Sequence, residues 1–212
     1  MKLLIGIFVG GRSRRMEGRA KGLLQAPHSQ QTLLDRLLTE ALAALPAAEC
    51  VLVGRQVEYA GHPLPVIEDA RADSGPLAGL VALLLAGQER GCTDVIALAC
   101  DMPYLSRASI GLIAAHAKNA NAVAPKRAVT RSVDGVQHED MIWEPLVARY
   151  ATGPCLRVAQ QRLSRGQLSL QGLLTELGAD CHGIELPEQE LSDWDTPEDV
   201  RAGDPTREAQ GG

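Results

Sequence analysis

The feature that most constrains this chain is a short, almost wholly apolar segment at its start. Residues 3–9 are apolar at every position except Gly6. A run without alternation predicts a β-strand covered on both faces, as in a parallel sheet flanked by helices. The run is short for a secretory signal, and glycine and arginine residues follow it instead of a cleavage site. We therefore expect a buried strand that leads into a glycine-rich loop.

Strand-like and helix-like patterns alternate through the first half of the chain. The expected helices cover residues 33–45, with Thr32 as N-cap and Pro46 as stop, 75–86 and 106–117; the expected strands cover 50–53, 64–67, 95–99 and 122–124. Such alternation predicts βαβ units. The fold class that we expect is α/β, a three-layer, doubly wound and mostly parallel sheet of the Rossmann-like kind.

The second half is less regular. The polar residues 125–141 predict a long loop, and Pro145 places residues 144–147 in an edge strand. Helices are expected over 156–165 and 168–177, a strand over 183–186, and a last helix with Thr196 as N-cap and Pro197 in its first turn. We expect one domain over residues 1–203 and a disordered tail over 204–212.

Composition excludes several classes of protein. Apolar residues make up 45% of the chain and aromatic residues 3%, so a core must be built from aliphatic side chains. A net charge of −5 argues against a nucleic-acid partner. No stretch is long and apolar enough to span a membrane, so we expect a cytoplasmic protein without a membrane partner. The five widely spaced cysteines form no CxxC pair and predict buried free thiols instead of a zinc site or a disulfide framework.

The loop after the first strand is strongly basic. It carries five basic side chains (Arg12, Arg14, Arg15, Arg19 and Lys21) against the single acid Glu17. Gly10 and Gly11 would let backbone N–H groups approach an anion closely. The pattern is neither GxGxxG nor a Walker A loop, which argues against a dinucleotide oxidoreductase and a P-loop ATPase. We interpret it as a triphosphate site; the alternative is a solvated surface loop.

Asp101 follows the all-apolar strand that is expected over residues 95–99. A carboxylate there can hold Mg²⁺ against phosphate oxygens, because hard cations prefer oxygen ligands; the alternative is a turn or cap aspartate before Pro103. In doubly wound sheets, ligands bind at the carboxyl ends of the strands. Both loops fall at such ends, so we expect Lys21 and Asp101 to meet at one sheet edge.

Six motifs resemble those of the nucleotidyltransferases that include molybdenum cofactor guanylyltransferase. The first runs from Phe8-Val9-Gly10-Gly11-Arg12-Ser13-Arg14-Arg15-Met16 to Lys21-Gly22 and is similar to the family's opening signature, L-A-G-G-x-S-x-R-M-G followed by a lysine. The others are Val66-Ile67-Glu68-Asp69, Gly75-Pro76-Leu77-Ala78-Gly79, Cys100-Asp101-Met102-Pro103-Tyr104, Glu144-Pro145-Leu146 and Asp195-Thr196-Pro197-Glu198-Asp199. They stand in the family's order and span nearly the whole chain.

The resemblance implies the nucleotidyltransferase variant of the Rossmann-like fold and a role for each matched residue. Arg15, Lys21 and Asp101 would be catalytic, and Mg²⁺ would bind to Asp101, with Asp195 or its neighbour Asp193 as a second ligand. The nucleotide would contact Phe8, Val9, Gly10, Gly11, Lys21, Gly54, Asp69, Gly75, Pro76, Leu77 and Asp101. The implied substrates are GTP and molybdopterin or the molybdenum cofactor, with transient contact to cofactor-biosynthesis or acceptor proteins.

The chain departs from the family's pattern within the site. Phe8 and Val9 replace Leu-Ala, Glu17 replaces a glycine, Ala20 replaces an aspartate, and Gly54 falls where some members have asparagine. Three alternatives stay open: a cytidylyltransferase for the same cofactor, a sugar-1-phosphate nucleotidyltransferase, and a protein that binds nucleotide or cofactor without turnover. The loop over 75–79 favours the guanylyl branch. Lys126, Arg127 and Arg131 are candidates for the acceptor's phosphate, and His138 for a weaker substrate contact.

Overall fold

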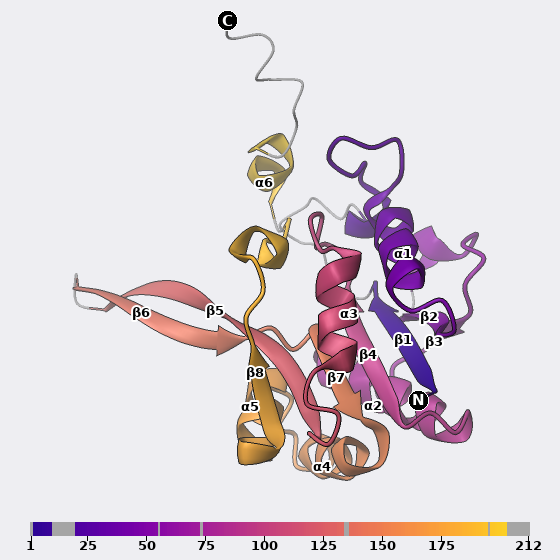
Figure 1. Ribbon diagram of the computed structural model, residues 1–212, viewed down its shortest axis with the longest axis vertical. Helices are drawn as coiled ribbons and strands as arrows, with labels where there is room; N and C mark the ends of the chain where they lie inside the picture. The colour runs from indigo at the N-terminus through magenta and orange to yellow at the C-terminus, as the bar shows by residue number, and fades with distance from the viewer. Residues whose placement is uncertain are drawn as a thin grey trace, which may run out of the picture.

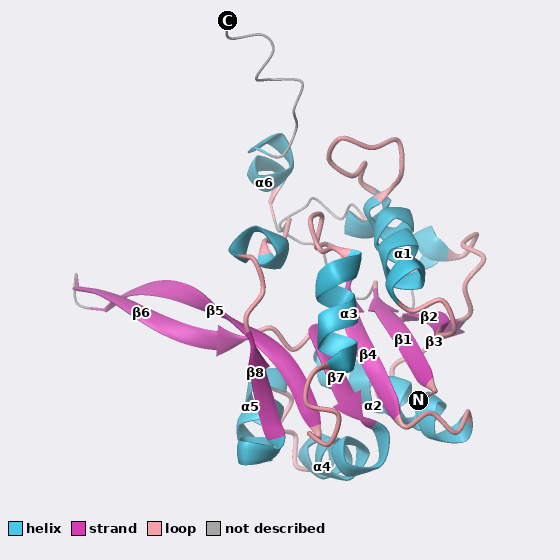
Figure 2. Ribbon diagram, viewed as in Figure 1, coloured by secondary structure: helices cyan, strands magenta, loops and turns pink. Residues whose placement is uncertain are grey.

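The computed structural model describes residues 2–9, 20–54, 56–72, 74–133, 136–194 and 196–202. Its described strands form one mixed sheet with helices on both faces, which confirms the α/β class (Figures 1 and 2). The strands are β1 (Leu3–Phe8), β2 (Glu49–Val53), β3 (Val66–Ile67), β4 (Asp94–Ala99), β5 (Ala122–Val133), β6 (Val136–Trp143), β7 (Val147–Ala151) and β8 (Cys181–Ile184). The α-helices are α1 (Leu33–Ala44), α2 (Gly75–Glu89), α3 (Arg107–Ala115), α4 (Thr152–Ser164), α5 (Leu170–Leu177) and α6 (Pro197–Ala202). Short 3-10 turns are η2 (Lys21–Leu23), η3 (Val57–Tyr59), η4 (Gly178–Asp180) and η5 (Glu188–Leu191).

One half of the sheet is parallel, in the order β3-β2-β1-β4. Phe8 at the end of β1 lies opposite Val53 of β2 on one side and Ala99 of β4 on the other. The carboxyl ends of three neighbouring strands therefore meet at one edge, as the doubly wound pattern requires.

The other half is mixed. β7 runs antiparallel to β4, and the first residues of β5 lie between β7 and β8. From Lys126 onwards β5 leaves the body and pairs with β6 in an antiparallel hairpin, which projects from the molecule in Figure 1. The parallel arrangement that we expected thus ends at β4.

The two faces of the sheet have separate cores. On β1, Leu3, Ile5 and Ile7 point to the face covered by α1 and α3, whereas Leu4 and Phe8 point to the face covered by α2, α4 and α5. All six residues of β1 and of β4 are buried, which explains why these strands are apolar at every position except Gly6 and Asp94.

Two expectations for the second half are wrong. Residues 125–141 form most of the β5–β6 hairpin instead of a loop, and residues 144–146 precede β7, which is a central strand between β4 and β5. The hairpin faces water along much of its length, so it lacks the apolar alternation that marks a half-buried strand. The dipeptide Asp134-Gly135 between two strands is a strong hairpin signal. It could have identified this element.

The capping residues agree with the sequence. Thr32 accepts a hydrogen bond from the backbone N–H of Asp35 at 3.1 Å, and Thr196 accepts one from Asp199 at 3.3 Å. Helix α4 begins at Thr152, four residues earlier than expected, and β8 spans Cys181–Ile184 rather than 183–186. The tail over 204–212 lies outside the described residues.

The cysteines are free thiols, as the sequence predicts, and four of the five are buried. All five cysteines are free; Cys92, Cys100, Cys155 and Cys181 are buried and Cys50 is half-buried. Burial raises the pKa of Cys155 to about 12 and that of Cys50 to about 11. None of the described helices combines the length and the apolar character that crossing a bilayer would need.

Candidate nucleotide and phosphate site

Lys21 and Asp101 meet at the carboxyl end of the parallel half. The ammonium Nζ of Lys21 lies 2.9 Å from Oδ2 of Asp101, and the two side chains are 16% and 19% exposed. The backbone holds the strand ends together here, because Cys100 N–H donates to the Phe8 carbonyl at 3.2 Å and Val9 N–H donates to the Val53 carbonyl at 3.0 Å. The expectation that Lys21 and Asp101 share one sheet edge is confirmed.

A second group of expected residues lies beside β1. A methyl group at Gly79 of α2 would be only 2.9 Å from the Phe8 ring, 3.0 Å from Oδ1 of Asp69 and 3.0 Å from Val53. Gly79 therefore lets the helix lie directly against the strand ends and the carboxylate. Partial burial raises the pKa of Asp69, although much of its surface is open to solvent.

Backbone hydrogen bonds hold the loops after β2 and β3 close to each other and to α2. The N–H of Gly54, at φ +92°, donates to the Ile67 carbonyl at 2.9 Å, and Ala70 N–H donates to the Ala78 carbonyl at 3.2 Å. Gly75 opens α2 at φ +66°, where a side chain would be strained, and Pro76 occupies the first turn. Gly54, Asp69 and the first turn of α2, which includes the buried Leu77, thus line one side of the edge.

A buried carboxylate lies on the other side of Asp101. Glu144 is 8% exposed and pairs with the guanidinium of Arg127 at the base of the hairpin. Burial raises the pKa of Glu144; Arg127 opposes this shift, and the negative charges of Asp193 and Asp101 add to it. Glu144 therefore lies near enough to Asp101 and Asp193 to be affected by their charges; its counter-ion is Arg127, and that of Asp101 is Lys21.

The C-terminal segment completes this side of the site. Trp194 N–H donates to the Asp101 carbonyl at 3.0 Å, and the Trp194 ring is buried with Ala26 and Leu33. Asp193 thus comes next to Asp101 from the far end of the chain. The resemblance implies Asp195 or Asp193 as the second metal ligand and assigns no role to Glu144.

The donor set is compatible with Mg²⁺ but does not form a cage. Among the described residues, no group of three or more His, Cys, Asp or Glu side chains is arranged to hold a metal. Mg²⁺ bound with a nucleotide commonly takes only one or two carboxylates, and phosphates and water fill the other positions. Asp101, with Asp193 nearby, meets that requirement.

Several expected residues are not tested or lie elsewhere. Gly10, Gly11, Arg15 and Asp195 lie outside the described residues. Lys126 has its ammonium 4.2 Å from the centre of the Trp143 ring, and Arg131 lies opposite the exposed His138 in the hairpin. Of the basic residues expected to bind the acceptor, Arg127 pairs with one of these carboxylates, Glu144.

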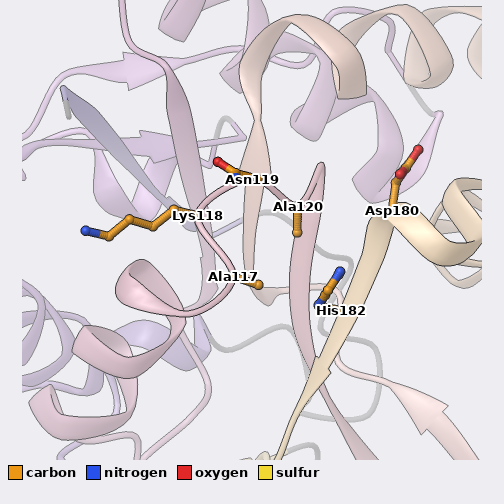
Figure 3. Close-up of a pocket in the computed structure, with 6 residues that line it drawn as sticks. All are labelled: Ala117, Lys118, Asn119, Ala120, Asp180 and His182. Atoms are coloured by element: carbon orange, nitrogen blue, oxygen red, sulfur yellow. The ribbon is translucent and has the colours of Figure 1, made fainter.

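A hollow of about 310 Å³ lies away from this site. Figure 3 shows it beside the starts of β5 and β8, with His182 and Ala120 at its wall and Lys118 turned away from it. This is the sheet edge opposite the Lys21–Asp101 pair, since β5 and β7 pair there at the amino end of β4.

Known proteins share both the sequence and the fold. A family model described as MobA-like NTP transferase domain matches residues 5–179. A probable molybdenum cofactor guanylyltransferase from Opitutus terrae is 32% identical over 200 residues, which cover 91% of this chain and 90% of that protein. A molybdenum cofactor guanylyltransferase from Pseudomonas putida is 29% identical over 199 residues, covering 91% and 92%.

Among solved structures, molybdopterin-guanine dinucleotide biosynthesis protein A from Archaeoglobus fulgidus superposes with a TM-score of 0.67 at 18% identity, covering 97% of this chain and 99% of that chain. A nucleotidyl transferase from Methanothermobacter gives a TM-score of 0.70 at 19% identity, covering 95% of each chain. These two likenesses show the fold. Because the family model spans most of the chain and a relative at 32% identity is matched almost from end to end, the chain belongs to the MobA-like NTP transferase family and is a nucleotidyltransferase.

Proposed function

We propose that this nucleotidyltransferase transfers GMP from GTP to the phosphate of molybdopterin or the molybdenum cofactor and releases pyrophosphate. The observation that carries the proposal is the contact of 2.9 Å between Lys21 and Asp101 at the ends of β1 and β4. It supports the proposal because a cation that would neutralise the phosphates and a carboxylate that would bind the metal lie at one sheet edge. Guanylyl transfer is the activity named for two relatives that match along 90% and 92% of their length.

The reaction needs alignment and charge neutralisation more than a protein nucleophile. An acceptor phosphate oxygen attacks the α-phosphorus of GTP, and the bond to the β-phosphate oxygen breaks as pyrophosphate leaves. Lys21 would neutralise the triphosphate, and Arg15 of the glycine-rich loop would add a second positive charge. Phe8, Gly54, Asp69 and the first turn of α2 would hold the nucleoside beside the strand ends.

Asp101 and Asp193 would hold Mg²⁺, and Asp195 is a further candidate. When bound, the ion would neutralise charge on the phosphate oxygens. The triphosphate and Asp101 would then compete for Lys21, because its ammonium contacts the same carboxylate that would bind the metal. We expect Lys21 to turn from Asp101 towards the phosphates when the nucleotide enters.

Arg127 would bind the acceptor phosphate. It lies beside Asp101 but on the side away from Asp69, and its guanidinium is 35% exposed while paired with Glu144. A guanidinium held by a buried carboxylate has a fixed orientation, and its planar fork suits phosphate recognition. The two substrates would thus approach Asp101 from opposite sides.

The test is pyrophosphate release by the purified protein with GTP, ATP, CTP or UTP, each with molybdopterin and Mg²⁺. We expect release with GTP and molybdopterin together, and its loss on chelation of the metal. Preference for CTP would make the protein a cytidylyltransferase. Saturable nucleotide binding without release under any acceptor would make it a binding protein, as Glu17 and Ala20 would allow.

A further inference from the structure

A buried tyrosine lies beneath the Lys21–Asp101 pair. Tyr59 ends the turn η3 and is 3% exposed. Its hydroxyl oxygen accepts a hydrogen bond from the backbone N–H of Gly22 at 2.9 Å, and the side chain of Cys100 packs in the same buried cluster as Tyr59. Gly22 follows Lys21 and Cys100 precedes Asp101. Tyr59 therefore packs close to both backbone segments that carry the ion pair and is hydrogen bonded to the Lys21 segment.

The packing around the Tyr59 hydroxyl leaves no room for a side chain at Gly22. A methyl group at Gly22 would lie 2.8 Å from the Tyr59 oxygen and 3.3 Å from Cβ of Cys100. The glycine is thus required for the backbone of η2 to approach the tyrosine. Burial raises the pKa of Tyr59 well above the usual range, so the group remains a neutral phenol.

The local sequence explains why η2 depends on a distant partner. A helical turn normally has a side-chain oxygen at its N-cap, which accepts the N–H of the second or third residue. The N-cap of η2 is Ala20, which has no such oxygen, and Gly22 is the second residue of the turn. The Tyr59 hydroxyl accepts the N–H that an N-cap serine or aspartate would otherwise take. Tyr59 thus caps this turn from 37 residues away.

We propose that Tyr59 is a positioning residue, whose hydroxyl caps the η2 turn and so fixes Lys21 for the triphosphate. The proposal rests on the proposed function, since it assigns Lys21 to the phosphates. It predicts that the Tyr59 hydroxyl affects nucleotide binding and turnover only through Lys21. A hydroxyl that served packing alone would affect stability and leave both unchanged.

Tyr59→Phe removes the hydroxyl and keeps the ring. We expect GTP affinity, measured by calorimetry, to fall several-fold and kcat for pyrophosphate release to fall about tenfold, because small misplacements of a catalytic group are costly. Tyr150→Phe is the matched control, since the Tyr150 hydroxyl is also buried and donates to a backbone carbonyl, that of Pro145, at 2.7 Å. The control should lose some stability and keep the affinity for GTP.

Two further variants separate positioning from packing. In a Lys21→Ala background, adding Tyr59→Phe should change GTP affinity and kcat less than about twofold, because coupled residues are not additive. Ala20→Ser should restore most of the loss in Tyr59→Phe, because serine supplies a local oxygen to the Gly22 N–H. Full additivity with Lys21→Ala, or no rescue by Ala20→Ser, would overturn the proposal.

The binding readout keeps this inference distinct from the proposed function. If the protein binds GTP without releasing pyrophosphate, guanylyl transfer is wrong, and the coupling between Tyr59 and Lys21 is still decided by affinity. If pyrophosphate release is normal in the wild type and unchanged in Tyr59→Phe, guanylyl transfer stands and the positioning role is wrong.

Discussion

The parallel half of the sheet and the β5–β6 hairpin are both built of β-strands, but they differ in burial and in support from neighbouring strands. In the parallel half, β1 and β4 are buried along their whole length and are held from both sides by neighbouring strands. In the hairpin, residues 137–141 of β6 are exposed, and Met141 is 60% exposed. Lys21 and Asp101 lie beside the buried strands, and the base of the hairpin approaches them through Arg127 and its partner Glu144.

This contrast indicates that the strands which carry the phosphate site must be rigid, whereas the outer hairpin need not be. A phosphate site must hold charges in place against water, and strands fixed on both sides provide that support. An exposed hairpin loses little if its outer part moves, because few buried contacts depend on it. We therefore expect the effect of a substitution on stability or activity to decrease with its distance from the junction of the two halves.

The largest effect should come from the seam that joins the two halves. Arg149 of β7 is fully buried, and its guanidinium contacts Oδ1 of Asp94 in β4 at 2.5 Å and also donates to the carbonyls of His116 and Ala117. Asp94→Ala would leave this cation without its carboxylate, which typically costs about 3–5 kcal/mol. Urea denaturation measures the loss. Glu198→Ala, which breaks the exposed pair with Arg201, is the control and should cost less than about 0.5 kcal/mol.

The next effect concerns the ion pair at the strand ends. Asp101→Ala and Lys21→Ala should each reduce kcat/KM for pyrophosphate release by about 10²–10³, because each removes one charge from the phosphate site. Circular dichroism should show an unchanged fold. Asp180→Ala, an exposed acid beside the opposite edge, should keep wild-type turnover. Wild-type rates in both site variants would refute the assignment of this edge as the site.

A smaller effect is expected at the base of the hairpin. Arg127→Ala removes the partner of the buried Glu144 and should cost about 1–2 kcal/mol near neutral pH. It should also raise KM for the acceptor while leaving KM for GTP unchanged. Lys126→Ala, which removes an exposed cation over Trp143, is the control and should cost about 0.5–1 kcal/mol without changing either KM.

The loss of stability caused by Arg127→Ala should be smaller at low pH than at neutral pH. The pKa of Glu144 is raised in the folded state, so its contribution to stability is present below its unfolded pKa and is lost as pH rises through the folded pKa. Without Arg127 the folded pKa rises further and the loss grows. The difference between the variant and the wild type should therefore be smaller near pH ~4 than at pH ~7, as measured by denaturation at both values. A pH-independent difference would mean that Glu144 is not the group responsible.

The smallest effect should follow from shortening the hairpin. Val129 and Asp140 lie opposite each other, four residues along each strand from the Val133–Val136 pair, so both pairs have the same place in the alternating hydrogen-bond pattern. Asn-Gly in place of residues 130–139 therefore closes the hairpin with a two-residue turn and keeps the register. We expect a change below about 0.5 kcal/mol and unchanged GTP binding, because the removed part contributes little buried surface. Loss of GTP binding in this variant would place the outer hairpin in the nucleotide site and erase the contrast between the two regions.

The sequence alone determined the parallel half and the outline of the site. Strands buried on both faces appear as continuous apolar runs, so β1 and β4 could be predicted from residue type, and the motifs after them identified Lys21 and Asp101. The N-caps Thr32 and Thr196 were equally local and equally predictable. Each of these features depends on neighbours within a few residues, which is the range that a sequence pattern records.

Tertiary packing, and not the local sequence, determines which distant residues contribute to that site. Tyr59 caps the Lys21 turn, Arg127 pairs with Glu144, and Trp194 bonds the Asp101 backbone through contacts that span 37, 17 and more than 90 residues. The exposed hairpin was misread as a loop because its residues face water and carry no burial pattern. Side-chain hydrogen bonds across such separations depend on how the chain packs, and no local preference of the residues encodes them.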